Sequence, residues 1–518
     1  MKPTCFLIAC VGLLTGCLGD KLAAHVLLSA AAIALGIAVA LPLAVWASRS
    51  EPVARATLGF ASLVQTIPAL ALLALFFPIL LSLRAVFGEG LPTLGFLPAL
   101  LALALYALLP ILRNAVTAQV NLDPGVIEAA HGVGMTFWQR LRLVEAPLTA
   151  PYIMAGIRTA AVWTIGAATL ATTIGQPSLG DPIFAGLQTQ NWVLVLAGCI
   201  ASAGLALVAD ALLGLIEKGL ATRRRMLTFG GLAAVLLGIL AALTVQFGDR
   251  GGDRIVIGAK GFSEQYILAR LIGQQLKAAG YGVEYRDGLG SAVAHQAVST
   301  GAIDVLVDYT GTIWTNQMER SDNPDRETML AEITAWETRT SGTHVLGRLG
   351  FENAYGLAMP RAAAEAGGFS SIGDLAGRAQ AMTVGGDPEF FERPEWIAVR
   401  EAYGLRFAAR RNFSPTFMYN ALTSGEADVI GAYTSDGRIA ADDLVILDDP
   451  EGAFPNYDAI ILLAPATGTD DALVAALEPL IGAIGVEAMR EANYSVDRTE
   501  DKLSFERAAQ RLAERIGQ

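Results

Sequence analysis

Six long, mostly apolar stretches occupy the first half of this chain, and the second half contains none. A helix needs about 20 such residues to cross a bilayer. The first half is therefore predicted to be an all-helical membrane domain over residues 22–247. Its spans are expected at 25–47, 57–83, 92–112, 150–174, 191–215 and 226–247. The second span is long enough to be tilted, or to break at Pro68 and Pro78.

The two halves also differ in charge. Residues 1–250 hold 14 Lys and Arg and 10 Asp and Glu, whereas residues 251–518 hold 23 and 39. The acidic second half argues against a nucleic-acid partner, because phosphates would be repelled. Basic residues of the first half gather in the loops after the first, third and fifth spans, which places these loops in the cytoplasm. Everything after residue 247 is then expected outside a bacterial cytoplasmic (inner) membrane.

The N-terminal segment, residues 1–21, allows two interpretations. Lys2, an apolar run and the string Leu14-Thr15-Gly16-Cys17 resemble a lipoprotein signal, with Cys17 as the lipidated residue. Alternatively, residues 1–19 form an additional, uncleaved span. The charge pattern fits both interpretations, so both stay open.

The few reactive residues exclude several kinds of chemistry. The second half has no cysteine, so neither a disulfide nor a thiolate site is expected there. The four histidines show no paired metal-ligand spacing, and we expect neither a metal nor a cofactor. None of the six lysines follows a glycine, so the chain lacks the phosphate-binding loop of an ATPase. Arg158 and Asp210 lie within expected spans, and we expect each to extend toward the membrane interface.

The loop between the third and fourth spans carries an ordered motif. Glu128-Ala129-Ala130 is followed by Gly134 and then by Val144-Glu145-Ala146-Pro147. This pattern resembles the EAA motif of ABC-importer permeases, although Val144 and Ala146 depart mildly from its usual apolar end. The resemblance implies a cytoplasmic coupling helix that docks on a separate P-loop ATPase subunit. The matching residues are Glu128, Ala129, Ala130, Gly134 and Pro147. An ordinary amphipathic loop helix is the alternative.

The second half alternates strands and helices after a short polar linker at 248–253. Such alternation predicts parallel sheets, with ligands bound beyond the carboxyl ends of the strands. We expect an α/β domain of two lobes, of the Venus-flytrap type, over residues 254–518. The first lobe is expected at about 254–358 and 462–518, and the second at about 359–461. Strands are expected at 254–258, 283–285, 303–307, 382–386 and 427–431, and helices at 264–279, 395–403 and 415–424.

Short motifs follow one another through this half. They are Gly258–Gln265, Asp308–Thr312, Asn353–Leu357, Glu389-Phe390 with Arg393, Ala432–Gly437 and Pro455–Tyr457. In this order they resemble the binding proteins of the glycine betaine, carnitine and choline uptake family, which includes ergothioneine importers. The whole chain thus resembles a fused permease and substrate-binding protein. The resemblance implies a transport subunit rather than an enzyme, with ATP hydrolysed by the separate ATPase, and a homodimer formed through the permease domain.

The chemistry of a quaternary amine explains the residue types in these motifs. A trimethylammonium group cannot donate a hydrogen bond, but it is attracted to the faces of aromatic rings. In the family a cage of tyrosines holds this cation, and lysine, threonine and arginine hold a ligand carboxylate. The matching cage residues are Tyr309, Tyr355, Tyr433 and Tyr457, and the matching carboxylate residues are Lys260, Thr312 and Arg393. Asp436 is expected to meet a ligand cation or a ring N–H, which suits a larger ligand such as ergothioneine. The chain departs from the family's usual Arg-Pro-Asp-Gly, because Arg393 is followed by Pro394-Glu395-Trp396.

Together these features predict an ATP-driven importer subunit with an external receptor. A carboxylate-bearing ligand (glycine betaine, carnitine or ergothioneine) is expected to bind better than choline, because Lys260 and Arg393 pair with a carboxylate. A choline importer and a membrane-anchored periplasmic sensor are the alternatives. A periplasmic enzyme would need a nucleophile–base pair or a metal cluster. A carrier driven by protons or sodium would need neither the loop motif nor a tethered receptor.

Overall fold

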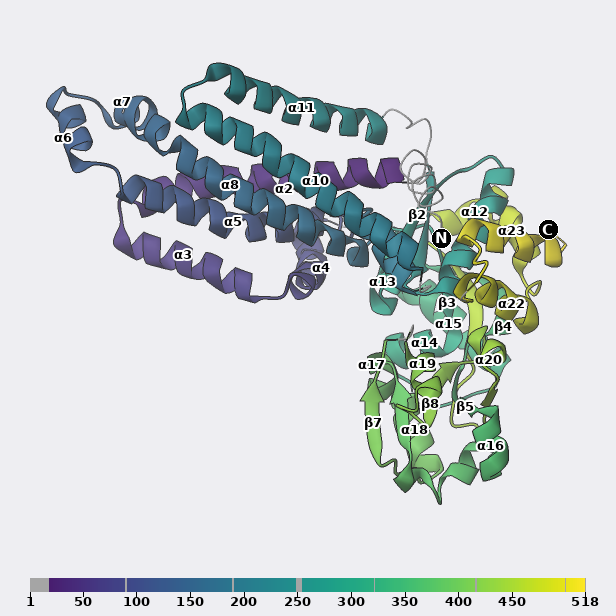
Figure 1. The fold of residues 1–518 in the computed structure, drawn as a ribbon. Coiled ribbons are helices and arrows are strands. Elements are labelled where there is room, and N and C mark those ends of the chain that lie inside the picture. The colour runs from purple at the N-terminus through teal and green to yellow at the C-terminus, as the bar shows by residue number, and fades with distance from the viewer. Residues whose placement is uncertain are drawn as a thin grey trace. The chain divides into compact units, whose positions relative to one another are not determined.

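The computed structural model describes residues 18–88, 91–188, 191–247, 254–320, 322–414, 417–498 and 500–517. The possible lipidation site Cys17 and the expected linker 248–253 lie outside the described residues. The chain divides into two compact units (Figure 1). One is helical and lies within residues 1–251; the other runs from residue 252 to the end and also takes in residues 184–192.

The helical unit is built around the long helix α5. Its helices are α2 (Leu18–Ala47), α3 (Glu51–Thr66), α4 (Ala69–Phe87), α5 (Phe96–Val120), α6 (Pro124–Gly132), α7 (Phe137–Arg140), α8 (Ala146–Ala168), α10 (Trp192–Ala221) and α11 (Arg225–Phe247). A further helix, α9 (Asp181–Gln188), is divided between the two units. Both α2 and α8 pack against α5. Glycines permit this close approach: a Cβ on Gly36 of α2 would lie 3.0 Å from Ala107 of α5, and one on Gly156 of α8 would lie 2.8 Å from the Pro110 carbonyl.

Within the described residues, five segments are long and apolar enough to cross a membrane, and α3 with α4 makes a sixth if the bent pair is one span. The pair is bent by 105° at residues 67–68. Ile67 is extended, as the residue before a proline prefers to be. The break expected at Pro68 is therefore found, whereas Pro78 stays inside α4.

Arg158 and Asp210 do not extend separately to the membrane interface, so that expectation is wrong. Arg158 of α8 donates to Asp210 of α10 from Nε at 3.0 Å and from Nη2 at 2.8 Å, and its Nη1 donates to Glu217 at 2.7 Å. In an apolar environment, charges that pair with one another are far less costly than isolated ones. The cluster therefore joins α8 to α10.

The second unit contains two five-stranded sheets, one in each lobe (Figure 1). The first sheet has the order β2-β1-β3-β10-β4 and the second the order β7-β6-β8-β5-β9. The strands are β1 (Arg254–Lys260), β2 (Gly282–Leu289), β3 (Val305–Tyr309), β4 (His344–Glu352), β5 (Tyr355–Pro360), β6 (Thr383–Gly386), β7 (Ala409–Asn412), β8 (Val429–Tyr433), β9 (Leu444–Ile446) and β10 (Asp458–Leu463).

Helices cover both sheets. They are α12 (Ser263–Ala278), α13 (Ser291–Ser299), α14 (Thr310–Thr312), α15 (Arg326–Thr340), α16 (Arg361–Gly367), α17 (Pro388–Glu392), α18 (Pro394–Ala402), α19 (Met418–Thr423), α20 (Arg438–Ala441), α21 (Asp471–Leu477), α22 (Val486–Asp497) and α23 (Phe505–Arg515). The helix α12 packs on β1 and is also covered by α22 and α23, which explains why most of its residues are buried.

The sheets are mixed rather than purely parallel, which corrects the expectation. β10 runs antiparallel to both β3 and β4, and β5 runs antiparallel to β8 and β9. The chain enters β5 directly from the first lobe, and it enters β10 directly from the second lobe. The crossings also lie a few residues before the expected 358 and 462, because β5 already pairs in the second sheet from Tyr355 and β10 in the first from Asp458.

Candidate ligand site and coupling loop

A pocket of about 300 Å³ is lined by residues of both lobes. It lies at the carboxyl ends of β1, β3, β6 and β8, where parallel strands usually present ligand sites. All eight residues that the sequence predicts for ligand binding line this one pocket. They are Lys260, Tyr309, Thr312, Tyr355, Arg393, Tyr433, Asp436 and Tyr457. Their roles in binding stay predictions.

Five aromatic rings form a continuous series along the pocket, which we call the aromatic wall: Tyr309, Phe262, Tyr433, Tyr355 and Tyr457. Neighbouring ring centroids in this order are 6.2, 6.4, 5.0 and 5.8 Å apart. Phe262 is nearly parallel to Tyr433, at 5° between ring planes, and it joins two of the predicted tyrosines. Ring faces attract cations, and two of these rings already face cations of the protein: Lys260 Nζ lies 5.3 Å from the centre of the Tyr309 ring, and the Arg393 guanidinium lies 5.3 Å from that of Tyr355.

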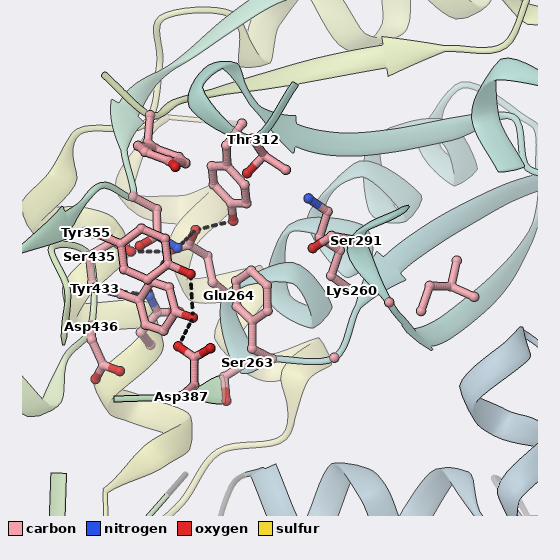
Figure 2. Close-up of a pocket in the computed structure, with 18 of the residues that line it drawn as sticks. Lys260, Ser263, Glu264, Ser291, Thr312, Tyr355, Asp387, Tyr433, Ser435 and Asp436 are labelled. Carbon is pink, nitrogen blue, oxygen red and sulfur yellow. Dashed lines mark hydrogen bonds between the residues drawn. The ribbon is translucent and has the colours of Figure 1, made fainter. Parts of the chain in front are cut away.

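The tyrosine hydroxyls are held by polar partners. The hydroxyls of Tyr355 and Tyr433 lie 3.4 Å apart, and Tyr433 donates to Asp387 at 3.1 Å (Figure 2). The other oxygen of Asp387 accepts from the backbone N–H of Phe390 at 2.9 Å, so this carboxylate also caps α17. These bonds hold the hydroxyl ends of the two rings in place, which helps to preorganise the wall.

A buried carboxylate, Glu264, joins the parts of the pocket. Its Oε1 accepts from Tyr309 at 2.6 Å and from Asn353 at 3.1 Å, and its Oε2 accepts from Ser435 at 2.5 Å and from Asn493 at 3.0 Å. Burial raises the pKa of Glu264, and these four donors partly oppose that shift. Burial and the neighbouring Glu264 also raise the pKa of Tyr309 well above its usual value, so its hydroxyl remains a donor.

The glycine of the Asp308–Thr312 motif makes room for one ring of the wall. A Cβ on Gly311 would lie 2.6 Å from the ring of Tyr457. Thr310 fixes the same contact, because its hydroxyl donates to the Asn456 carbonyl at 3.1 Å and accepts from the Asp458 N–H at 3.0 Å. The motif therefore positions Tyr457, which is distant in sequence.

The three basic residues that line the pocket, among those described, each have a carboxylate beside them. Lys260 lies 2.5 Å from Asp308, and both side chains are buried. Arg438 lies 2.5 Å from Asp436, so the expected role of Asp436 toward a ligand cation competes with this pair.

Arg393 is the third of these basic residues. Its Nη1 is 3.3 Å from Glu395 and 3.1 Å from the Tyr457 hydroxyl, which itself donates to Glu395. In all three cases the charge seen by a ligand is reduced, because part of the attraction is already satisfied within the protein.

The residues of this pocket that sequence reasoning did not assign include Phe262, Glu264 and Asp387. The first two lie inside the Gly258–Gln265 motif, where they were interpreted as the turn and start of a helix. Asp387 lies two residues before Glu389, just outside the Glu389-Phe390 motif, and the structure shows it as the N-cap of α17. Their partners lie far away in the sequence, so no local spacing pointed to them.

The coupling loop begins with α6, which is capped by Asp123 and carries the EAA residues. Glu128 and Ala129 are exposed, whereas Ala130 is buried. Gly134 has a φ of +76°, a left-handed conformation that favours glycine, and it ends this turn. Pro147 lies in the first turn of α8. Three apolar side chains of the loop are widely exposed: Val133 at 74%, Trp138 at 67% and Leu143 at 66%. Such a surface suits a protein partner.

Apolar helices with an exposed EAA-type loop, followed by two α/β lobes around an aromatic pocket, define a membrane permease joined to a substrate-binding domain. Residues 32–222 match the family model for the inner membrane component of binding-protein-dependent transport systems. Residues 253–514 match the model for the substrate binding domain of ABC-type glycine betaine transport systems. The chain belongs to this family of ABC importers, as a fused permease and substrate-binding protein.

Curated relatives match one or both halves. The chain is 30% identical over 472 residues to the ergothioneine transport permease/ergothioneine binding protein of Helicobacter pylori, covering 88% of this chain and 82% of that protein. It is 41% identical over 198 residues to a glycine betaine/carnitine/choline transport system permease protein of Bacillus subtilis, covering 38% of this chain and 86% of the relative.

A solved glycine betaine/carnitine/choline ABC transporter structure is 23% identical, with a TM-score of 0.46, and covers 50% of this chain and 98% of its own. The family matches confirm the predicted fold class and family. They also confirm the predicted location: a multi-pass inner-membrane protein with its binding domain outside.

Proposed function

We propose that this importer takes up a carboxylate-bearing quaternary amine: glycine betaine, carnitine or ergothioneine. The aromatic wall is the observation that carries this proposal. Each ring face attracts a desolvated cation by about 0.5–2 kcal/mol, and the attraction does not depend on hydrogen-bond donors in the ligand. The pocket volume of about 300 Å³ suits a compact ligand of this kind.

Lys260, Thr312 and Arg393 support the assignment of a ligand carboxylate. They line the same pocket as the wall, so one end of a zwitterion can meet rings while the other meets these donors. The relative from Helicobacter pylori, which matches both halves of this chain, is named for ergothioneine. Ergothioneine carries both a quaternary amine and a carboxylate.

Choline is the second candidate, and the internal ion pairs favour it. Lys260 and Arg393 already face Asp308 and Glu395, and Asp387 also lines the pocket. A ligand with a cation and no carboxylate would meet an environment that is not strongly positive. The choice between the two candidates therefore depends on how strongly Lys260 and Arg393, each already beside a carboxylate, still attract a ligand carboxylate.

A direct titration separates these candidates. The purified full-length chain in lipid nanodiscs is titrated calorimetrically with glycine betaine, carnitine, ergothioneine and choline. We expect at least one carboxylate-bearing ligand to bind more tightly than choline. Equal or tighter binding of choline than of all three others would replace the first proposal with the second.

Energy for uptake is proposed to come from a separate P-loop ATPase subunit that docks on the coupling loop. One chain offers one such loop, and a working ATPase pair needs two, so we propose a homodimer formed through the permease domain. Replacing Glu128 by Lys, or Gly134 by Phe, should abolish uptake and leave ligand binding normal. Uptake that survives in both variants would show that the ATPase docks elsewhere.

A further inference from the structure

The coupling loop contains a buried carboxylate that the docking surface does not use. Glu145 ends the π-helical turn Leu141–Glu145, directly before α8, and is 5% exposed. Arg49 donates to its Oε2 at 2.9 Å and Arg140 donates to its Oε1 at 2.7 Å. We call Arg49, Arg140 and Glu145 the loop lock. Single π-helical turns of this kind often mark functional positions in helices.

The loop lock reaches several helices at their cytoplasmic ends. Arg49 lies just after the end of α2, and its guanidinium lies over the ring of Phe137 in α7, 4.6 Å from the ring centre. Next to it, Ser48 donates to Gln119 of α5 at 2.6 Å. Arg140 also hydrogen-bonds to His131 of α6. One buried carboxylate therefore connects both short loop helices, the start of α8 and the end of α2.

The Arg49 contact is the one that joins the loop to a helix that is not its neighbour in sequence. The loop continues directly into α5 on one side and into α8 on the other, so its motion reaches these helices through the backbone. The end of α2 is far away in sequence and is connected to the loop through side chains. Motion of the loop without α2 would separate Glu145 from Arg49 and leave it paired with Arg140 alone, and the loss of this buried contact resists such motion.

We propose that Glu145 is a positioning residue of the transport cycle, which holds the coupling loop to the cytoplasmic end of α2 through Arg49. Displacement of the loop by the ATPase is then passed to α2 as well as to α8. The inference rests on the proposed docking of the ATPase on this loop. It goes further by assigning to residues outside the docking surface the task of carrying the motion into the helices.

The chain offers a matched control on the next helix. Arg55 pairs with Glu51 at 3.3 Å on the surface of α3, where the side chains are 74% and 82% exposed. Exposed pairs of this kind contribute little. Arg49→Ala and Arg55→Ala thus remove the same side chain a few residues apart, one from the loop lock and one from a solvated pair.

Each variant is expressed with the ATPase subunit of the importer, and uptake, ATP hydrolysis and ligand binding are measured in proteoliposomes. We expect Arg49→Ala to lower uptake about tenfold or more, within the range of coupling energies between sites, with ligand binding unchanged. Basal ATP hydrolysis should persist while its stimulation by ligand is lost. Arg55→Ala should stay within about twofold of the wild type. Wild-type uptake and stimulation by Arg49→Ala would overturn the proposal.

A conservative variant separates a lost connection from a misfolded loop. Arg49→Ala leaves Glu145 paired with Arg140, so no buried carboxylate is isolated and the loop should still fold. Arg49→Lys keeps a cation beside Glu145 and should restore uptake to within a few-fold of the wild type; uptake as low as in Arg49→Ala would overturn the proposal. Glu128→Lys tests whether the ATPase docks on this loop, whereas Arg49→Ala tests the loop lock. Normal uptake in Glu128→Lys refutes the docking. Normal uptake in Arg49→Ala alone refutes the loop lock.

Discussion

Glu395 stands where the family usually has an aspartate after Arg-Pro. Its substitution by Gln tests most directly whether a ligand carboxylate binds Arg393. Its carboxylate lies 3.3 Å from Nη1 of Arg393 and accepts from the Tyr457 hydroxyl, and both charged side chains are nearly fully buried. If a ligand carboxylate binds Arg393, as we propose, it must compete with Glu395 for this side chain. Gln has almost the same shape, and its amide oxygen still accepts from Tyr457.

The size of the effect follows from that contact. A hydrogen bond to a charged group contributes about 1.5–3 kcal/mol, and 3.3 Å is longer than the strongest such bonds, so we take the lower end. About 1.4 kcal/mol corresponds to a tenfold change in affinity. Glu395→Gln should therefore strengthen glycine betaine binding about tenfold. Choline binding should stay the same or weaken slightly, because choline has no carboxylate and loses one nearby negative charge.

Calorimetric titration of the full-length protein in nanodiscs measures both affinities. Glu401→Gln is the control, because it makes the same change at an exposed position of the same helix, α18. It should leave both ligands unaffected. An equal change for glycine betaine and choline, or weaker glycine betaine binding in Glu395→Gln, would refute the idea that Glu395 competes with the ligand.

Three further predictions concern the wall, the carboxylate end and pH. Tyr433→Ala removes one ring face and should weaken glycine betaine and choline alike by about 1–2 kcal/mol in calorimetric titration; an effect on one ligand alone would contradict a shared cation site. Arg393→Ala should weaken glycine betaine far more than choline in the same assay, and an unchanged glycine betaine affinity would exclude a carboxylate contact. Burial raises the pKa of Asp497 from 3.8 to about 6 although Arg438 opposes the shift, so the folded state favours the protonated acid. The contribution of Asp497 to the free energy of unfolding is then fully present below pH 3.8 and is lost as pH rises through about 6. Denaturant unfolding at several pH values should show this loss in the wild type and a smaller one in Asp497→Asn, whereas equal pH slopes would contradict the argument.

Motif order selected residues that are distant in sequence and line one pocket, and their role in ligand binding stays a prediction. Lys260, Tyr309 and Tyr433 could be assigned to one site in this way, and they line one pocket. Glu264 could not be recognised, because its four donors come from four separate segments and a glutamate at the start of a helix has a sufficient local explanation.

Two features of the fold escaped sequence reasoning for different physical causes. Alternation of strands and helices indicates which segments are strands but not their direction, so the reversed strands β5 and β10 were not expected. Hydropathy treats each span separately, so it gave no sign that Arg158 and Asp210 pair across two helices. The break at Pro68 was foreseeable, because proline restricts the residue before it.

The bend between α3 and α4 sets a parity condition on the topology of the membrane unit. The basic loops after α2 and after α5 both belong in the cytoplasm, so the chain must cross the membrane an even number of times between them. Because α5 supplies one crossing, α3 and α4 together must supply an odd number despite their 105° bend. If the pair only dipped into the bilayer and returned, α5 would begin on the cytoplasmic side. Every later helix would then be inverted, and the receptor would lie on the wrong side of the membrane.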